Sequence, residues 1–300
     1  MSVRSAAEAI FSPPVQNWLK RTIYRHNCRM SPPRYRSALK RWYWLFKCRP
    51  CHLEDPRTMT EKIHWLKLYD STPLKGRLAD KFLVRQWVAD TVGEKYLIPL
   101  LGVWDSPDEI DFDSLPDSFV LKATHGSGWN ILVPDKSALD EDWARRRLRE
   151  WLGLRQAMKG GFELHYEYCE PRLRDYKFMV FDGVIQFVFT VDRLPGRALR
   201  GTYLPDWTRA PFEYTCEADR APDVPPPNGL ETMRSLACEL GKGFACARID
   251  FYEVDGNIYF GEITFTDADG LSEFAPSCYD RVFGDRIILP EKKSFKGVML

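Results

Sequence analysis

Apolar side chains recur at helical spacing in several parts of the chain. Residues 14–47 carry this pattern on both sides of Pro32-Pro33, which predicts a helix broken at the two prolines. The stretch from Thr58 to Glu61 has the sequence of a helix start, with Thr58 or Thr60 as the cap. The same spacing predicts three further helices, over residues 78–92 (ending near Gly93), 140–158 and 231–242.

Other segments alternate apolar and polar residues, or form short apolar runs, which are typical of strands. The predicted strands cover residues 96–103, a pair within 118–134, 176–181 with 184–191, and 245–254 with 258–266. Asp182-Gly183 is a strong signal for a two-residue hairpin turn. Helices and hairpins alternate without regular βαβ units, so the pattern predicts an α+β fold.

The last predicted hairpin has two faces of different character. Its odd-numbered positions form an apolar face, made of Ala247, Ile249, Phe251, Tyr259, Ile263 and Phe265. Its even-numbered positions form a polar face, made of Arg248, Asp250, Glu262 and Thr264. The apolar residues share one core only if odd positions pair with odd positions, which requires a loop with an odd number of residues. This pairing predicts that Asp250 and Glu262 lie side by side.

Two carboxylates on adjacent strands suit a hard cation such as Mg²⁺, which prefers carboxylate, phosphate and water oxygens. A nearby arginine can stabilise developing negative charge. Spacing alone leaves two alternatives open. One is an exposed sheet face with an Arg–Asp ion pair. The other is the carboxylate pair of a glycosidase, although no other feature of the sequence indicates a sugar cleft.

A glycine-rich stretch, HGSG at residues 125–128, separates the two apolar runs of 118–134, and Lys122 lies in the first run. It is either a loop that closes over phosphates or a tight turn beside one lysine that reaches solvent. The sequence contains no P-loop, no complete dinucleotide fingerprint and no kinase signature. It also lacks the G-x-S-x-G elbow of hydrolases.

Charge is unevenly distributed along the 300 residues, whose net charge is +1. Residues 9–53 contain no Asp or Glu but many Lys, Arg and aromatic residues, so the remainder of the chain is acidic. This composition predicts contact with an anionic membrane or glycan. The alternative is a helical extension that folds onto the acidic remainder. Nucleic acid is not expected as a partner, because no zinc-finger, RRM or basic-zipper pattern is present.

No apolar run approaches the length of a membrane span, and no secretory signal is evident at the N-terminus. We therefore expect a cytoplasmic protein, with peripheral contact at the inner face of the membrane. The 8 cysteines are scattered, which favours reduced thiols. Cys48, Cys51 and His52 match a haem-attachment motif and half of a zinc site, but without a second such pair a chance arrangement is favoured.

Beyond these separate motifs, long stretches of the sequence resemble the teichuronopeptide-biosynthesis (TupA-like) ATP-grasp family. They cover about residues 55–285 in family order and include TMTEKIHWLKLYD, VLKATHGSGWNILVPDKS, DYKFMVFDGVIQF and ACARIDFYEVDGNIYFGEITFTDADGLSEF. The resemblance implies an ATP-grasp-like two-lobed fold with antiparallel sheets. Its implied parts are a basic helical extension (1–54), a helical region (55–117), a first lobe with the glycine-rich flap (118–170) and a second lobe with a metal-binding hairpin (171–300).

The resemblance also implies roles for individual residues. ATP would be bound by Lys81 and Lys122, under a flap formed by Gly126, Ser127 and Gly128. Lys177 and Arg248 would act in catalysis, facing the phosphates and the acyl intermediate. Mg²⁺ would be held by Asp250 and Glu262, with Thr264 at a position where many ATP-grasp enzymes have asparagine. Gly270 and Leu271 would line the acceptor site.

The implied activity is ATP-dependent ligation of a carboxylate to an amine through an acyl phosphate. The family context implies a uronic-acid-type cell-surface polymer as the carboxylate and an amino acid or peptide as the amine. One departure concerns adenine: only Leu173 and Arg174 lie where the family has a strand that contacts this base. The alternative interpretations are therefore a non-catalytic relative that binds an anionic glycan or membrane, and a sugar-directed transferase.

Overall fold

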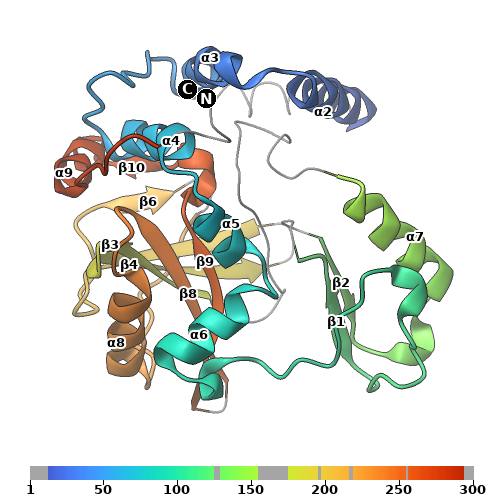
Figure 1. The fold of residues 1–300 in the computed structure, drawn as a ribbon. Coiled ribbons are helices and arrows are strands. Elements are labelled where there is room, and N and C mark those ends of the chain that lie inside the picture. Colours follow the sequence, from blue (N-terminus) through green and yellow to red (C-terminus); the bar gives the residue numbers. More distant parts are fainter. Residues whose placement is uncertain are drawn as a thin grey trace.

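The computed structural model describes residues 13–124, 129–154, 175–194, 197–215, 219–254 and 256–293. Its largest element is a six-stranded sheet with the strand order β7-β5-β4-β3-β8-β9, which is antiparallel except between β5 and β7 (Figure 1). The strands are β3 (Asp175–Phe181), β4 (Val184–Leu194), β5 (Arg197–Tyr203), β7 (Asp219–Arg220), β8 (Ala247–Val254) and β9 (Asn257–Thr264). The α+β fold is thus confirmed, and so is the hairpin at Asp182-Gly183, where both residues have positive φ.

Side chains of β3 alternate between two hydrophobic cores, one on each face of the sheet. Phe178 and Val180 pack against α8 (Leu230–Gly241), close to its predicted range, and α6 (Val84–Val92). Met179 and Phe181 point to the other face, where aromatic residues of β4, β6 (Glu213–Thr215), β10 (Glu273–Ala275) and α9 (Cys278–Arg286) gather. Burial of each large apolar side chain contributes about 1.5–3 kcal/mol, so the cores on both faces stabilise the sheet.

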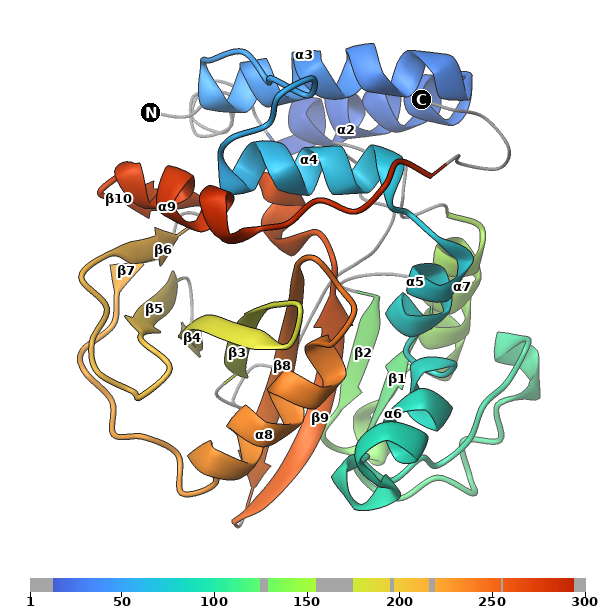
Figure 2. The same cartoon turned by 60° about the vertical axis from the view of Figure 1, so that its left-hand side comes forward.

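The N-terminal helices cover the second of these cores. The helix broken at the prolines is confirmed as α2 (Pro13–Cys28), a 3₁₀ turn (Pro32–Arg34) and α3 (Tyr35–Lys47). α3 buries Tyr35, Ala38, Leu39 and Tyr43, which recur at helical spacing, in the same core as α4 (Met59–Tyr69) (Figure 2). Thr58 and Glu61 form a capping box at the start of α4, as predicted. At least α3 therefore folds onto the rest of the protein.

The helix predicted over residues 78–92 is two helices, α5 (Pro73–Ala79) and α6. Asp80 separates them because its carboxylate accepts the backbone N–H groups of Phe82 and Leu83, each at 2.9 Å. Such local side-chain bonds compete with helical backbone bonds, and sequence periodicity does not reveal them. The predicted end at Gly93 is confirmed, since this glycine caps α6.

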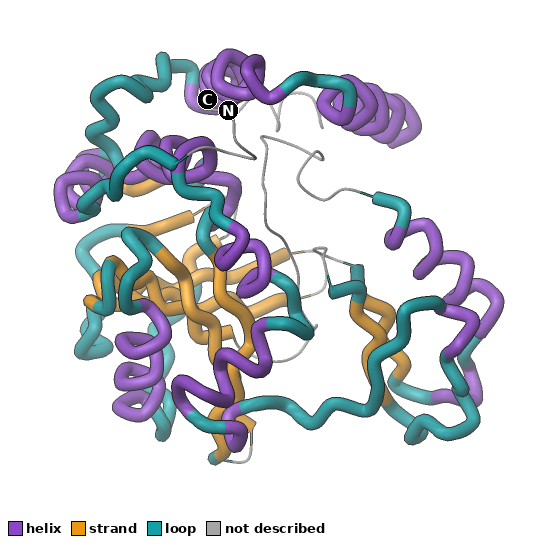
Figure 3. Tube along the Cα trace, viewed as in Figure 1, coloured by secondary structure: helices purple, strands orange, loops and turns teal. Residues whose placement is uncertain are grey.

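The strand predicted over residues 96–103 is wrong. A 3₁₀ turn covers Glu94–Tyr96, and the following residues run as a loop to Phe119 apart from a second 3₁₀ turn, Pro107–Glu109 (Figure 3). The apolar side chains of Leu100 and Leu101 are half exposed. Within the described residues no strand pairs with this segment, and an apolar run without a pairing partner does not form sheet.

A second, smaller body contains β1 (Phe119–Lys122), β2 (Asn130–Val133), a 3₁₀ turn (Lys136–Ala138) and α7 (Glu141–Leu152), around a core of its own. The predicted strand pair is confirmed, and the two-lobed fold with it. α7 starts at its Asp140 cap as predicted but ends at Leu152, before residue 158. Residues 155–174, which include the departure at Leu173 and Arg174, lie outside the described residues. The domain boundaries at 54, 117 and 170 stay predictions.

Candidate functional site

The β8–β9 hairpin pairs the two carboxylates by a different route from the one predicted. Val254 pairs with Asn257, so the connection has two residues and not an odd number. The register then shifts: Phe251 pairs with Phe260, whereas Asp250 pairs with Glu262. Gly261 is the extra residue of a β-bulge, which corrects the parity of the pairing. Asp250 and Glu262 therefore do lie side by side.

The bulge also changes which side chains of β9 are buried. Before the bulge the buried apolar residues of β9 are Ile258 and Phe260, and after it Ile263. The prediction that Tyr259 belongs to the apolar face was thus wrong. Glycine suits the bulge, because a Cβ on Gly261 would lie 2.9 Å from the Tyr252 ring and 3.2 Å from the carbonyl oxygen of Asp250.

Asp250 lies at the centre of a buried charge cluster. It is 1% exposed and pairs with Lys177 of β3 across the sheet, where the Lys177 ammonium contacts its Oδ2 atom. Arg248 on the same strand donates from Nε to Oδ1 and from Nη2 to Oδ2, both at 2.7 Å. This two-pronged contact fixes the plane of the carboxylate.

Arg248 also joins two further carboxylates to the cluster. Its Nη2 donates to Glu262 Oε1 at 2.5 Å, and its Nη1 donates to Asp267. Asp267 in turn accepts a 2.7 Å hydrogen bond from the hydroxyl of Tyr214. Sequence reasoning missed Asp267 and Tyr214. The available signal was the acidic TDADG stretch directly after β9, which forms a 3₁₀ turn (Asp267–Gly270).

The two paired carboxylates titrate in opposite directions. Burial raises the pKa of Asp250, but the charges of Arg248 and Lys177 outweigh it and hold this pKa below its ordinary value. Burial and the neighbouring charge of Asp250 raise the pKa of Glu262, against the attraction of the same cations. The side chain of Glu262 is 23% exposed, so solvent reaches the pair from its side.

Of the two predicted nucleotide-facing lysines, Lys81 lies near this cluster and Lys122 lies near Lys81. Lys81 is partly buried, and its backbone N–H donates at 3.1 Å to the carbonyl oxygen of Thr124, two residues after β1. Burial lowers the pKa of its ammonium group, opposed by the charge of Glu262 and reinforced by that of Lys122. Lys122 itself is exposed, opposite Asn130 in the β1–β2 pair. Lys81 thus lies within electrostatic reach of both Glu262 and the β1 strand.

The remaining predicted site residues differ in their surroundings. Thr264 pairs with Arg248 but is 1% exposed. Gly126, Ser127 and Gly128 lie outside the described residues. Gly270 is buried with a φ of 68°, and a Cβ there would lie 2.6 Å from Nδ1 of His64. Only glycine suits this close, left-handed position. Leu271 follows it and is partly buried.

The donor set fits Mg²⁺. Asp250 and Glu262 supply hard oxygen ligands from adjacent strands, and a divalent cation beside them would relieve the repulsion that raises the pKa of Glu262. Within the described ranges, no group of three His, Cys, Asp or Glu side chains could hold a metal ion. Mg²⁺ usually completes its shell with waters and substrate phosphates, so two protein carboxylates suffice.

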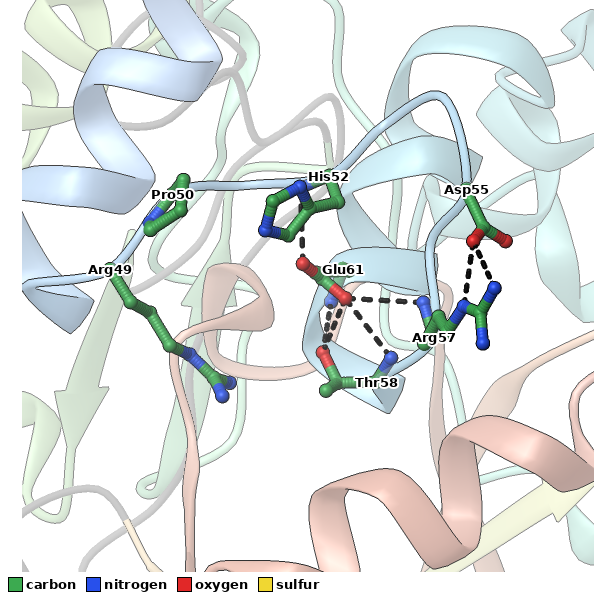
Figure 4. A pocket seen from close by; sticks show the side chains of 7 residues that line it. All are labelled: Arg49, Pro50, His52, Asp55, Arg57, Thr58 and Glu61. Atoms are coloured by element: carbon green, nitrogen blue, oxygen red, sulfur yellow. Dashed lines mark hydrogen bonds and ion pairs between the residues drawn. The ribbon is translucent and has the colours of Figure 1, made fainter.

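A separate pocket of about 330 Å³ lies at the start of α4 (Figure 4). It is lined by Arg49, Pro50, His52, Asp55, Arg57, Thr58 and Glu61. Glu61 occupies its centre and accepts the backbone N–H groups of His52, Arg57 and Thr58. The N–H groups that could have bound an anion are therefore already paired with a carboxylate. Of the nearby cysteines, Cys48 is exposed whereas Cys51 is buried.

Comparison with known proteins agrees with the predicted resemblance. The sequence matches the TupA-like ATPgrasp family model over residues 61–288, whereas a search of curated proteins gave no match. Among solved structures, D-alanine–D-alanine ligase from Bacillus anthracis is 18% identical, with a TM-score of 0.39 over 71% of this chain and 66% of that chain. D-cycloserine synthetase DcsG is 17% identical, with a TM-score of 0.36 over 72% of each chain.

This chain spans slightly less than two thirds of the ligase's length, and both TM-scores are low, so neither similarity bears on activity. The family match is of a different kind, because it covers most of the sequence, including Lys81, Lys177 and the whole β8–β9 hairpin. The chain belongs to the TupA-like ATP-grasp family.

Proposed function

We propose that this protein is an ATP-dependent carboxylate–amine ligase that acts through an acyl phosphate. The observation that carries the proposal is the pairing of Asp250 with Glu262, with Arg248 bonded to both carboxylates and Lys177 bonded to Asp250. These residues lie on one face of a sheet. Lys81, from the link between α5 and α6, interacts electrostatically with Glu262 and with Lys122 of the smaller body. The two carboxylates suit the binding of Mg²⁺, and the surrounding cations suit the binding of a polyphosphate.

The proposal gives each of these residues a role. Asp250 and Glu262 would hold Mg²⁺, and the bound metal supplies charge neutralisation at the phosphates. Lys81, Lys122 and Lys177 would bind phosphate oxygens. Arg248, held in place by Asp250 and Asp267, would stabilise negative charge on the reacting carboxylate. ATP supplies the phosphoryl group for the acyl phosphate, and attack by an amine then forms the C–N bond and releases phosphate.

The proposed substrates are a uronic-acid-type carboxylate and the amine of an amino acid or peptide, in the biosynthesis of a cell-surface polysaccharide or teichuronopeptide-like polymer. Membership of the TupA-like family supports this choice. Such a reaction uses ATP and precursors from the cytoplasm, so we place it there. The acceptor would approach the turn at Gly270 and Leu271, next to Asp267.

The test is an assay for the activated carboxylate. The protein is incubated with MgATP, glucuronate or oligogalacturonate, and hydroxylamine, which captures an acyl phosphate as a hydroxamate. Release of ADP together with hydroxamate is expected from wild type, and Asp250→Asn or Glu262→Gln is expected to reduce the rate by about 100-fold or more. Asp206→Asn is the control, because Asp206 is exposed and its carboxylate accepts hydrogen bonds from Thr208 of the same turn.

Other results of this assay would favour one of the two alternative functions. If millimolar MgATP neither raises the melting temperature of wild type nor yields ADP, the non-catalytic binding protein is the better description. If ADP forms without hydroxamate and phosphate appears on the sugar, the protein is a sugar-directed transferase. Binding of ATP that is equal in wild type and in both carboxylate variants would contradict the proposed Mg²⁺ ligands.

A further inference from the structure

One side of helix α2 packs on the protein. Asn27 on this side is 6% exposed, and Tyr24 and Cys28 pack against the core beneath α3 and α4. The other side exposes large apolar side chains: Trp18 is 63% exposed and Val15 40%. Figure 1 shows α2 at the periphery of the molecule.

The exposed apolar residues and Leu19 lie along one face of the helix. At about 100° per residue, Val15, Trp18, Leu19 and Ile23 fall within an arc of about 140°. Leu19 is partly buried and Ile23 is 37% exposed. Tyr24 lies on the opposite side of the same helix wheel, which agrees with its packing. The exposed arginines Arg21 and Arg25 border one edge of the face.

We propose that this face of α2 docks on an anionic lipid bilayer. The helix contains no Asp or Glu, and its 16 residues include Lys20, Arg21 and Arg25. A helix that combines an apolar face with a basic edge lies in the plane of a membrane, with its apolar side chains below the headgroups and its arginines at the lipid phosphates. Tryptophan is favoured at this depth.

The pairing of apolar and basic side chains distinguishes a bilayer from an acidic glycan. A glycan supplies anions for Arg21 and Arg25 but no apolar phase for Trp18, Val15 and Ile23. A bilayer supplies both. No helix in the described part of the chain is long and apolar enough to cross a membrane, and the docked arrangement requires none, because α2 would lie flat on the surface.

The proposal does not depend on the proposed ligase activity. None of the α2 residues belongs to the charge cluster on β3, β8 and β9. Loss of membrane binding and loss of ligase activity are therefore separate outcomes.

The test is co-sedimentation of the full chain with vesicles. Wild type is expected to sediment with vesicles of equal parts phosphatidylcholine and phosphatidylglycerol, and not with phosphatidylcholine alone. Each arginine contributes about fivefold in affinity to such a surface, so Arg21→Glu with Arg25→Glu is expected to weaken binding at least about 25-fold. Trp18→Ser with Ile23→Ser removes the apolar contact and is expected to abolish sedimentation.

Matched controls lie elsewhere on the surface. Trp143→Ser removes an exposed tryptophan of α7, and Arg234→Glu with Lys242→Glu makes the same change in net charge at α8. Both are expected to bind as wild type does. The proposal is overturned if wild type does not bind the anionic vesicles, if the control variants lose binding equally, or if the chain binds polygalacturonate in place of vesicles.

Discussion

The indole Nε1 of Trp42 donates a 3.0 Å hydrogen bond to Oδ2 of Asp269, and so joins α3 to the turn that follows β9. Lys67 of α4 contacts the same carboxylate and donates to the Asp269 carbonyl oxygen at 2.6 Å. Asp269 has a φ of 59°, in the left-handed region that costs free energy for residues other than glycine. The same turn supplies Asp267 to Arg248. A helix outside the matched residues 61–288 thus supports the candidate site.

Replacing Trp42 by phenylalanine tests this support. The substitution keeps an aromatic side chain but removes the donor to a partly buried carboxylate, so unfolding in urea is expected to require about 1.5 kcal/mol less. Trp44→Phe is the matched control, because Trp44 lies on the same helix and is 58% exposed. Its effect is expected to stay within about 0.5 kcal/mol. Equal effects of both substitutions would show that the hydrogen bond to Asp269 contributes nothing.

The bulge at Gly261 offers a second test. In Gly261→Val the new side chain meets the Tyr252 ring and the Asp250 backbone, and overpacking of this kind costs about 1–3 kcal/mol. Relief of the clash moves β9 relative to β8, so the melting-temperature increase given by MgATP is expected to shrink as well. Gly76→Ala is the control, since a Cβ there has nothing within 4 Å. An unchanged MgATP effect in Gly261→Val would separate the bulge from metal binding.

The sequence predicted the pairing of Asp250 with Glu262 correctly and its cause wrongly. Apolar patterning reports which residues share a core, so it requires both carboxylates on one face. It does not report whether an odd loop or a bulge achieves this, because both give the same parity at Asp250. The choice depends on close contacts of Gly261 with Tyr252 and Asp250, which appear only when the strands are assembled.

Two other features could not be predicted from sequence patterns, because they depend on contacts between distant parts of the chain. The exposed apolar run near Leu100 has the composition of a strand, but strand formation depends on a partner that the pattern does not supply. Asp267 contacts Arg248 from outside the two strands, so strand alternation could not place it. By contrast, the Thr58–Glu61 capping box and the turn at Asp182-Gly183 depend on neighbours in sequence, and both were predictable.

Removal of Arg248 is expected to destabilise the fold strongly. Arg248→Met removes the guanidinium bonded to Asp267 and leaves Lys177 as the cation at Asp250, and loss of one partner from a buried charge cluster costs about 3–5 kcal/mol. Arg281→Met is the comparison, because Arg281 and Asp285 form an exposed ion pair, which contributes less than about 1 kcal/mol. Urea unfolding of both variants measures the difference. Similar values would mean that the cluster is not closed to solvent.

Thiol labelling checks the surroundings of the Cys48–His52 segment. Burial raises the pKa of Cys51 to about 12, and the same holds for Cys246, whereas Cys48 and Cys278 are exposed. An aromatic disulfide reagent near pH 8 is therefore expected to label Cys48 and Cys278 in the native protein, because the thiolate is the reactive form. Cys51 and Cys246 are expected to react only after unfolding. Added zinc should not slow the labelling of Cys48; protection by zinc would instead support a metal site with His52.

The raised pKa of Glu262 makes the stability of the metal-free protein depend on pH. The folded state holds this proton more tightly than the unfolded state, so wild type loses stability as pH rises from the ordinary carboxyl range through the raised value. Glu262→Gln keeps the side chain uncharged. Its stability relative to wild type is therefore expected to increase over that interval and to stay constant below it.

Asp250→Asn should show the opposite sign, because the pKa of Asp250 is lowered. Its wild-type carboxylate contributes stability above the ordinary carboxyl pKa, and this contribution is lost as pH falls. Urea midpoints of the three proteins, measured in chelator across the acidic to neutral range, give both differences. Bound Mg²⁺ requires ionised ligands, so saturating MgATP is expected to cancel the advantage of Glu262→Gln at neutral pH. A pH-independent difference for Glu262→Gln would show that folding does not raise the pKa of Glu262.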